Sequence, residues 1–204
     1  MTKNNLYFDE DISKLRLYAK ENNVPIIKDE GLSFLLNTIK LKNCKNVLEI
    51  GTAIGYSAIM MAKCGTNVVT FERDENMYNL AINNIKDFGL DNKINVIYHD
   101  ALDGASLLNG KKFDLLFIDA AKAQYQKFFD IFTPFLSDNG VVVCDNMYFH
   151  GYLDKPQEEL SRNIRGMMRK LNAFHEYLLN NKDYDTSIYD NIGDGISISI
   201  KRNK

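Results

Sequence analysis

The chain has little of several features that mark common classes of protein. It contains three cysteines, Cys44, Cys64 and Cys144, and none of them forms a C-x-x-C pair. That spacing argues against a disulfide framework or a zinc site and favours a reducing compartment. No apolar run is long enough to span a bilayer, and no signal-peptide pattern begins the chain. We therefore expect a cytoplasmic protein with no membrane partner.

A large excess of charge and obvious linkers are also missing. The formal net charge of -2 does not favour a strongly basic nucleic-acid binder overall. There is no internal repeat, low-complexity tract or proline- and glycine-rich linker among the 204 residues. The length suits one domain. We expect a helical segment over residues 1–40, serving as a cap or subunit contact, and the main domain over residues 41–204.

What the chain does have is a series of short apolar runs that each end on an acidic residue. Runs of this length, rich in Val, Ile and Phe, are typical of buried parallel strands. Ligands bind beyond the carboxyl ends of such strands, so the acids are expected to meet on one edge of the sheet. The five runs are Val47–Glu49, Val68–Glu72, Ile94–Asp100, Phe113–Asp119 and Val141–Asp145.

Helical periodicity alternates with these runs and predicts the fold class. The connecting helices are expected over Tyr56–Lys63, Glu75–Phe88 and Ala123–Phe135. Strands alternating with helices predict an α/β protein with a Rossmann-like, doubly wound, mostly parallel sheet. Near the end, Ser187–Tyr189 and Gly195–Ile200 flank a glycine-rich turn and are expected to close the sheet edge as an antiparallel pair.

The first strand runs into a glycine loop that indicates a cofactor site. Gly51 and Gly55 let the backbone pass close to a ligand, and the helix that follows offers free amide groups. The loop is not G-x-G-x-x-G, and Glu49 before it suits an amino-bearing ligand better than a pyrophosphate. S-adenosylmethionine is such a ligand, because it carries an ammonium and a sulfonium group.

Two further strand ends extend this interpretation. Glu72 follows the glycine loop by about twenty residues, where a carboxylate can accept hydrogen bonds from a ribose diol. Asp100 and Ala101 could receive an adenine amino group. The alternative is that each acid is a helix cap or turn former.

Three oxygen-bearing side chains after the fourth and fifth strands indicate a metal site. Asp119, Asp145 and Asn146 fit Mg²⁺, which prefers oxygen ligands. Lys122 lies three residues after Asp119 and could accept a proton as general base beside the metal. The alternatives are ordinary Asx turns for the three oxygen ligands and a solvated helix-start position for the lysine.

These residues together resemble the metal-dependent O-methyltransferases of the catechol and caffeoyl-CoA type, over most of the chain. The resemblance implies S-adenosylmethionine and Mg²⁺ as cofactors, a seven-stranded sheet and a homodimer. It also implies a metal site of Asp119, Asp145 and Asn146, with Lys122 and Asp119 as catalytic residues. The cofactor contacts that it implies are Ile27, Glu49, Gly51, Thr52, Tyr56, Ser57, Glu72, Asp100, Ala101 and Asp119.

Within this family, the segments Leu48–Ile59 and Phe117–Gln126 resemble bacterial tRNA 5-hydroxyuridine methyltransferases. That resemblance implies methyl transfer to the 5-hydroxyl at the wobble position in the tRNA anticodon loop, giving 5-methoxyuridine. The hydroxyl and the neighbouring C4 carbonyl could chelate a metal much as a catechol does. The expected RNA contacts are Arg162, Arg165, Arg169 and Lys170, spaced along one predicted helix face, and His150.

The sequence is also compatible with other functions. A small-molecule O-methyltransferase for catechols or phenolic thioesters needs the same cofactor and metal residues, and the basic helix face is then an ordinary solvated surface. His150 could equally be an ordinary surface histidine. A nicotinamide dehydrogenase is disfavoured by the missing third glycine. A non-catalytic nucleotide-binding module is disfavoured by the presence of Lys122 and the metal set.

Overall fold

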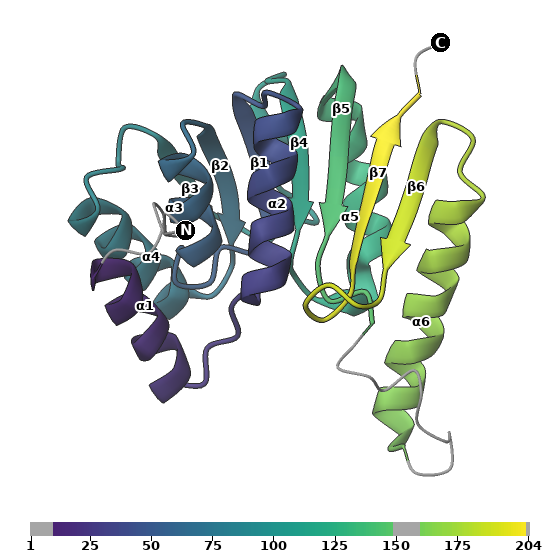
Figure 1. The fold of residues 1–204 in the computed structure, drawn as a ribbon, viewed down its shortest axis with the longest axis horizontal. Coiled ribbons are helices and arrows are strands. Elements are labelled where there is room, and N and C mark those ends of the chain that lie inside the picture. The colour runs from purple at the N-terminus through teal and green to yellow at the C-terminus, as the bar shows by residue number, and fades with distance from the viewer. Residues whose placement is uncertain (1–9, 149–159, 203–204) are drawn as a thin grey trace, which may run out of the picture.

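A seven-stranded sheet with helices on both faces forms the molecule. The computed structural model describes residues 10–148 and 160–202. The strand order is β3-β2-β1-β4-β5-β7-β6 (Figure 1). All pairings among β1 to β5 are parallel, whereas β7 pairs antiparallel with both β5 and β6. The predicted α/β, doubly wound sheet with an antiparallel edge is confirmed.

The strands have the following bounds: β1 Asn46–Ile50, β2 Asn67–Glu72, β3 Ile94–Tyr98, β4 Phe113–Ile118, β5 Leu136–Cys144, β6 Tyr184–Tyr189 and β7 Ile196–Lys201. The α-helices are α1 Glu10–Glu21, α2 Asp29–Leu41, α3 Tyr56–Lys63, α4 Glu75–Asp87, α5 Tyr125–Phe132 and α6 Arg162–Leu179. Three short 3₁₀ helices are η1 Ala105–Leu108, η2 Lys122–Gln124 and η3 Thr133–Phe135.

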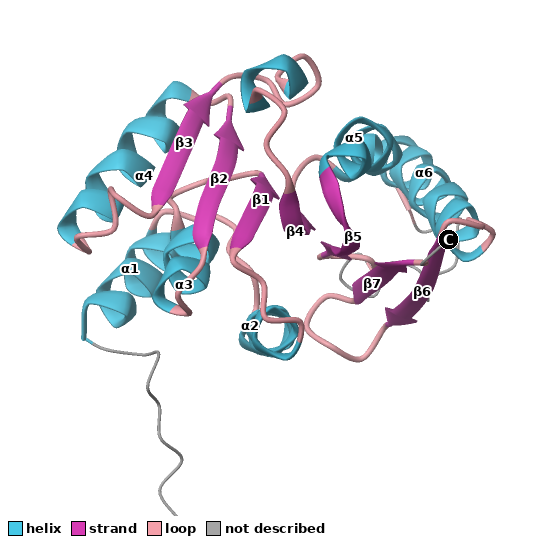
Figure 2. Cartoon of the chain, turned by 90° about the horizontal axis from the view of Figure 1, so that it is seen from above, coloured by secondary structure: helices cyan, strands magenta, loops and turns pink. Residues whose placement is uncertain are grey.

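The sheet separates the hydrophobic core into two layers, each covered by helices. Helices α1, α2 and α3 lie on one face of the sheet, and α5 and α6 lie on the other (Figure 2). Buried residues of α1 to α4 pack in the first layer, and those of α5 and α6 pack in the second. Because both faces of the central strands are covered, β4 is apolar on both sides from residue 115 to residue 118, as expected for a buried parallel strand.

The predicted helix over Ala123–Phe135 is divided in the structure. The α-helical part, α5, ends at Phe132, and Pro134 lies at the start of η3. Proline has no amide proton and its ring clashes with the preceding turn, so it stops the α-helix here. At the other end of the predicted helix, the short η2 turn precedes α5. Lys122 is its first residue and comes four residues after the end of β4.

Helix α6 covers the outer half of the second layer. Its N-cap is Ser161, whose hydroxyl accepts a hydrogen bond from the amide of Ile164 at 3.3 Å. Leu171, Phe174 and Leu178 face the core at spacings of three and four residues. Within residues 10–148 and 160–202, no helix combines the length and hydropathy required to cross a bilayer.

The chain reverses its winding direction between β1 and β4, and this position fixes where a ligand can bind. Strand β1 pairs with β2 on one side and with β4 on the other, so the loops after β1 and β4 leave the sheet in opposite directions. A crevice forms at such a switch point, beyond the carboxyl ends of the strands.

Candidate active site

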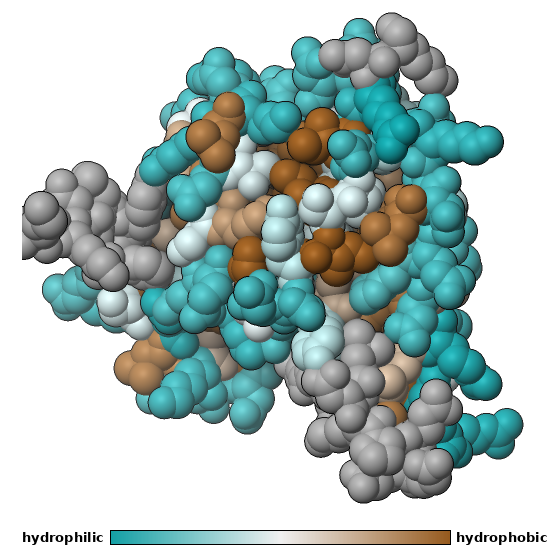
Figure 3. All heavy atoms as spheres, turned by 45° about the vertical axis from the view of Figure 1, so that its right-hand side comes forward, coloured by the Kyte–Doolittle hydropathy of each residue, from teal (hydrophilic) through white to brown (hydrophobic). Residues whose placement is uncertain are grey.

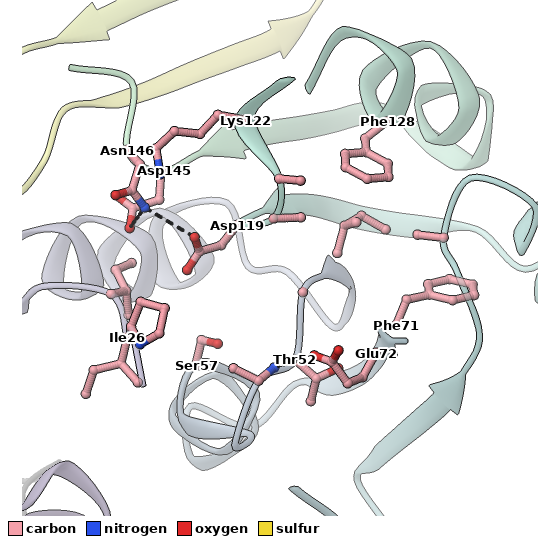
Figure 4. Close-up of a pocket in the computed structure, with 18 of the residues that line it drawn as sticks. Ile26, Thr52, Ser57, Phe71, Glu72, Asp119, Lys122, Phe128, Asp145 and Asn146 are labelled. Atoms are coloured by element: carbon pink, nitrogen blue, oxygen red, sulfur yellow. Dashed lines mark hydrogen bonds between the residues drawn. The ribbon is translucent and has the colours of Figure 1, made fainter. Parts of the chain in front are cut away.

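A cavity of about 520 Å³ opens at the carboxyl edge of the sheet (Figure 4). Its lining comes from the loops after β1, β2, β3, β4 and β5, the segment before α2, the start of α3, Phe128 of α5 and Asp194 of the β6–β7 turn. The volume is in the range of ordinary cofactor and substrate pockets. The cavity has a half lined by the glycine loop and Glu72, and another half lined by Asp119, Asp145, Asn146 and Lys122, as Figure 4 shows.

The glycine loop approaches the β4 loop too closely for any side chain. Gly51 has φ of +103°, and a Cβ built on it would lie 2.1 Å from the carbonyl oxygen of Asp119. The Asp119 amide in turn donates to the carbonyl oxygen of Ile50 at 3.0 Å. Glycine is therefore required at position 51, because it alone permits both the positive φ and the close approach. The loop after β1, which contains Gly51, and the loop after β4, which contains Asp119, therefore hold each other in place.

Glu49 lies deeper than the sequence suggested. Strand β1 continues to Ile50, and the Glu49 side chain is 0% exposed and is not among the residues lining the cavity. Its Oε1 accepts a 2.5 Å hydrogen bond from the hydroxyl of Ser57. Its Oε2 has no hydrogen-bond partner among the described residues. The expectation that all five acids meet on one exposed edge is therefore wrong for Glu49, since it lies within the strand.

Burial raises the pKa of Glu49 to about 8, and the hydrogen bond from Ser57 opposes part of that rise. A buried carboxyl with one oxygen lacking a partner favours a nearby cationic or hydrogen-donating ligand. Ser57 itself lines the cavity, so the Glu49 carboxyl is connected to the cavity through this hydroxyl.

Glu72 is held in place by main-chain groups at the other end of the cavity. Its Oε2 accepts from the amide of Ala53, and its Oε1 accepts from the amides of Arg73 and Asp74, all at 2.8 Å. The N-cap of α4 is Asp74, which accepts from the amide of Met77. Glu72 is therefore not the cap of that helix, and its carboxylate lines the cavity in a fixed orientation.

Asp100 also lines the cavity, but its carboxylate already has partners. It accepts hydrogen bonds from the amide of Leu102 at 3.0 Å and from the guanidinium of Arg73 at 3.1 Å. The amide of Leu102, followed by Arg73, lowers the pKa of Asp100. Ala101 is buried beside it.

The three predicted metal ligands converge at the opposite end of the cavity. The Asn146 amide nitrogen donates to Asp119 Oδ1 and to Asp145 Oδ2, each at 3.2 Å, as the dashed lines in Figure 4 show. Asn146 adopts φ of 58°, a left-handed conformation that asparagine tolerates better than most residues. Tyr125 fixes the backbone of this stretch by donating its hydroxyl to the carbonyl oxygen of Asp145 at 3.0 Å.

The charged forms of the Asp119 and Asp145 carboxyls are disfavoured by burial. Burial raises the pKa of both Asp119 and Asp145, and the neighbouring Asp119 raises that of Asp145 further. The ammonium of Lys122 opposes the rise at Asp119. Asp145 is 3% exposed, so water cannot fully solvate its charge.

These residues fit a divalent cation that prefers oxygen. Two carboxylates share one amide side chain between them, and amide oxygens and carboxylates are the ligands that Mg²⁺ takes, with water completing the shell. The described part of the chain contains no cluster of three or more His, Cys, Asp or Glu side chains suited to a metal. Zinc favours nitrogen and sulfur ligands, whereas Asp119, Asp145 and Asn146 offer oxygen, so zinc is the poorer fit.

The structure brings together almost all predicted site residues. Of the predicted cofactor contacts, every one except Glu49 lines the cavity, as do Lys122, Asp145 and Asn146. Further lining residues had no clear sequence signal as ligand contacts, and they include Pro25, Ile26, Lys28, Phe71, Arg73, His99, Phe128 and Asp194. In the sequence, Asp194 stood out only as part of the glycine-rich turn, and Phe71 and Phe128 only as members of a predicted strand and a predicted helix.

The predicted basic residues divide into two groups. Arg162, Arg169 and Lys170 are exposed and line a surface hollow on α6 that also includes Ala123, next to Lys122. Arg165 is half-buried and does not line this hollow, and the RNA contact expected of these residues stays a prediction. His150 lies outside the described residues.

The O-methyltransferase family model matches residues 7–202. The tapetum-specific methyltransferase 1 of Arabidopsis thaliana is 32% identical over 184 residues, covering 87% of this chain and 77% of that protein. A caffeoyl-CoA O-methyltransferase of Populus kitakamiensis is 27% identical, covering 89% of this chain and 80% of its own length.

A solved structure from Staphylococcus aureus, provisionally named a caffeoyl-CoA O-methyltransferase, is similar along almost the whole chain. Its TM-score is 0.90 and its sequence is 40% identical, with 95% of this chain and 93% of that chain covered. Both the sequence match and the fold match therefore extend over the sheet and the cavity.

Proposed function

We propose, since this chain belongs to the O-methyltransferase family, that it transfers a methyl group from S-adenosylmethionine to one of two adjacent oxygens on its acceptor. The favoured acceptor is a small phenolic molecule of the catechol or phenolic-thioester class. The observation that carries the proposal is the two-ended cavity, in which Asp119 joins the glycine loop at one end to Asp145 and Asn146 at the other. The names of the Populus and Staphylococcus relatives favour the same acceptor class.

The cofactor half is assigned from the fixed polar groups that line it. Glu72, oriented by three backbone amides, would accept the hydroxyls of the ribose. Ser57, backed by the buried Glu49, would receive the ammonium end of the methionine part. Phe71 and Phe128 line the same cavity and would enclose the adenine ring between apolar surfaces.

The metal half is assigned to Asp119, Asp145 and Asn146, which would hold Mg²⁺. When bound, the ion would lower the pKa of the acceptor hydroxyl and orient both of its adjacent oxygens. Lys122 lies on the rim of the same cavity, within electrostatic reach of Asp119 and Asp145. Its amine would take the hydroxyl proton as general base.

The proposed reaction moves one proton from the acceptor to Lys122 and one methyl group from the cofactor to the acceptor. The acceptor oxygen gives its proton to Lys122 Nζ and uses an electron pair to form a bond to the methyl carbon. The bond between that carbon and the sulfonium sulfur breaks, and its electrons stay on sulfur, which leaves as the neutral thioether of S-adenosylhomocysteine. The cavity walls hold the two reactants in line, which removes much of the entropic cost of their meeting.

A direct test compares two acceptors that differ by a single oxygen. A catechol and the matching monophenol are each incubated with the protein, Mg²⁺ and S-adenosylmethionine labelled on the methyl group. We expect methylation of the catechol and at least about a hundredfold slower reaction of the monophenol, which cannot present two oxygens. Equal rates for the two acceptors would refute the proposed role of the second oxygen.

The hollow on α6 favours a second acceptor, 5-hydroxyuridine at the wobble position of tRNA. Arg162, Arg169 and Lys170 are exposed there, and the hollow reaches Ala123 next to the proposed base. Exposed cations of this kind contact phosphate groups. This acceptor is tested by mass spectrometry of tRNA nucleosides from cells lacking the protein. Accumulated 5-hydroxyuridine with lost 5-methoxyuridine would establish it, and an unchanged nucleoside profile would exclude it.

A homodimer is also proposed, on the basis of an uncovered face of the sheet. No helix of the described residues lies over β6 and β7 on the α2 side (Figure 2), and hydrophobic residues gather on this side of the molecule (Figure 3). Ile198 and Ile200 are only partly buried there, and Tyr189, 38% exposed, contacts Phe34 of α2. Light scattering should give the mass of two chains, and a single-chain mass at micromolar concentration would contradict the dimer.

A further inference from the structure

Two segments that are far apart in the sequence meet at the cavity through one ion pair. Lys28 is the last residue before α2, and Asp194 lies in the turn between β6 and β7. Both residues line the cavity, and Lys28 Nζ lies 2.5 Å from Asp194 Oδ1. The Asp194 side chain is 11% exposed and that of Lys28 is 53% exposed, so the pair is half shielded from water.

The Asp194 side of the pair is fixed by the surrounding backbone. The amide of Tyr148 donates to the carbonyl oxygen of Asp194 at 2.8 Å, and the amide of Met147 donates to that of Gly195 at 2.9 Å. A Cβ on Gly195 would lie 2.4 Å from the Tyr148 nitrogen, so the turn is pressed against the stretch that follows the proposed metal ligands. Asp194 therefore has little freedom to move away from the cavity.

The Lys28 side is held far more weakly. Residues 25–28 lie at the end of the connection between α1 and α2, have no regular structure and form one wall of the cavity. Residues 26–28 donate no backbone hydrogen bond to any described residue. At the α2 end the carbonyl oxygen of Lys28 accepts a hydrogen bond from the amide of Leu32 at 2.8 Å. The other anchors of this wall are the buried side chain of Ile27 and the contact from Lys28 to Asp194.

We propose that the Lys28–Asp194 ion pair is a positioning contact that holds the wall of residues 25–28 against the bound cofactor. Neither residue is assigned to the reacting atoms, and both act through the wall. The inference rests on the proposed function for the identity of the ligand, S-adenosylmethionine. It predicts that breaking the pair lets the wall move outward and the cofactor leave faster.

The test measures the dissociation constant of S-adenosylhomocysteine by calorimetry, which requires neither acceptor nor turnover. Lys28→Met and Asp194→Asn should each raise the dissociation constant about five- to tenfold, and the double variant should be no weaker than either single variant. Lys28→Arg keeps the pair and should bind like the parent protein. The matched control is Lys14→Met, which removes an exposed ion pair with Glu10 on α1.

Salt provides a second readout that a purely structural role would not change. Raising the salt concentration from about 50 mM to about 500 mM should weaken binding more in the parent than in the double variant, because screening acts on a half-exposed pair. Circular dichroism would check that Asp194→Asn is folded, and Lys28→Met, which removes only a half-exposed charge, tests the pair without that substitution.

Three outcomes would overturn the inference. They are unchanged binding in both single variants, additive losses in the double variant, and shifts of opposite sign, which would indicate action through charge rather than position. Failure of the parent protein to bind S-adenosylhomocysteine would instead count against the proposed function, so the two failures are distinguishable.

Discussion

Glu49 should make the stability of the protein fall as pH rises, and Glu49→Gln should remove that dependence. The carboxyl is fully buried, and burial raises its pKa from 4.5 to about 8. In the unfolded chain the group loses its proton near pH 4.5, whereas in the folded protein it keeps the proton until about pH 8. Over that window the folded state binds more protons than the unfolded state, so the free energy of unfolding decreases with rising pH.

The size of the effect follows from the width of the window. The folded and unfolded pKa values differ by about 3.5 units, and each unit corresponds to 1.36 kcal/mol, which gives an upper bound of about 5 kcal/mol. The contribution is fully present below pH 4.5 and is lost by about pH 8. Glutamine keeps an oxygen that can accept the hydrogen bond from Ser57, so the substitution removes the titration with little change in packing.

The assay is urea unfolding of the parent and of Glu49→Gln between about pH 4.5 and pH 9, without cofactor. Other buried acids titrate in both proteins, so the difference between the two curves isolates Glu49. We expect the variant to gain stability relative to the parent as pH rises, by at least about 2 kcal/mol across the window. Parallel curves with a constant offset would show that Glu49 is ionised in the folded protein, and would refute the reasoning.

Three other substitutions test separate parts of the structure. Lys122→Met should lower kcat by about 10²- to 10⁴-fold while leaving S-adenosylhomocysteine binding unchanged in calorimetry, and a near-normal kcat would exclude Lys122 as the base. Phe174→Ala should cost about 3–5 kcal/mol in urea unfolding, because this ring is 2% exposed in the core beneath α6. Gly51→Ala should destabilise the protein by at least about 2 kcal/mol, since the new Cβ would meet the Asp119 carbonyl at 2.1 Å, and a folded variant of parent stability would contradict that geometry.

The sequence predicted the fold and most of the cavity lining because strand ends are encoded locally. Glu72, Asp119 and Asp145 come at or directly after the ends of their strands, and each lines the cavity. Parallel strands end at the same edge of a sheet, so residue order along the chain was enough to place them together. Glu49 was misplaced because β1 continues one residue further, to Ile50.

Other parts of the site depend on contacts that no local pattern encodes. Lys28 and Asp194 are 166 positions apart and meet only because the β6–β7 turn folds back onto the start of α2. Phe128 lies on a helix whose periodicity indicates a core residue and gives no indication of a ligand contact. The half-buried position of Arg165 depends on how α6 is rotated against the core, which residue spacing alone did not determine.

The proposed methyl transfer depends most on Asp119, Asp145 and Asn146 acting together as the ligands of one divalent cation. The measurement that tests this directly is the rate of catechol methylation by protein stripped with a chelator, before and after Mg²⁺ is restored. We predict that the stripped protein loses activity but still binds S-adenosylhomocysteine, and that Mg²⁺ restores the rate. Methylation at the full rate in the presence of the chelator would contradict the account.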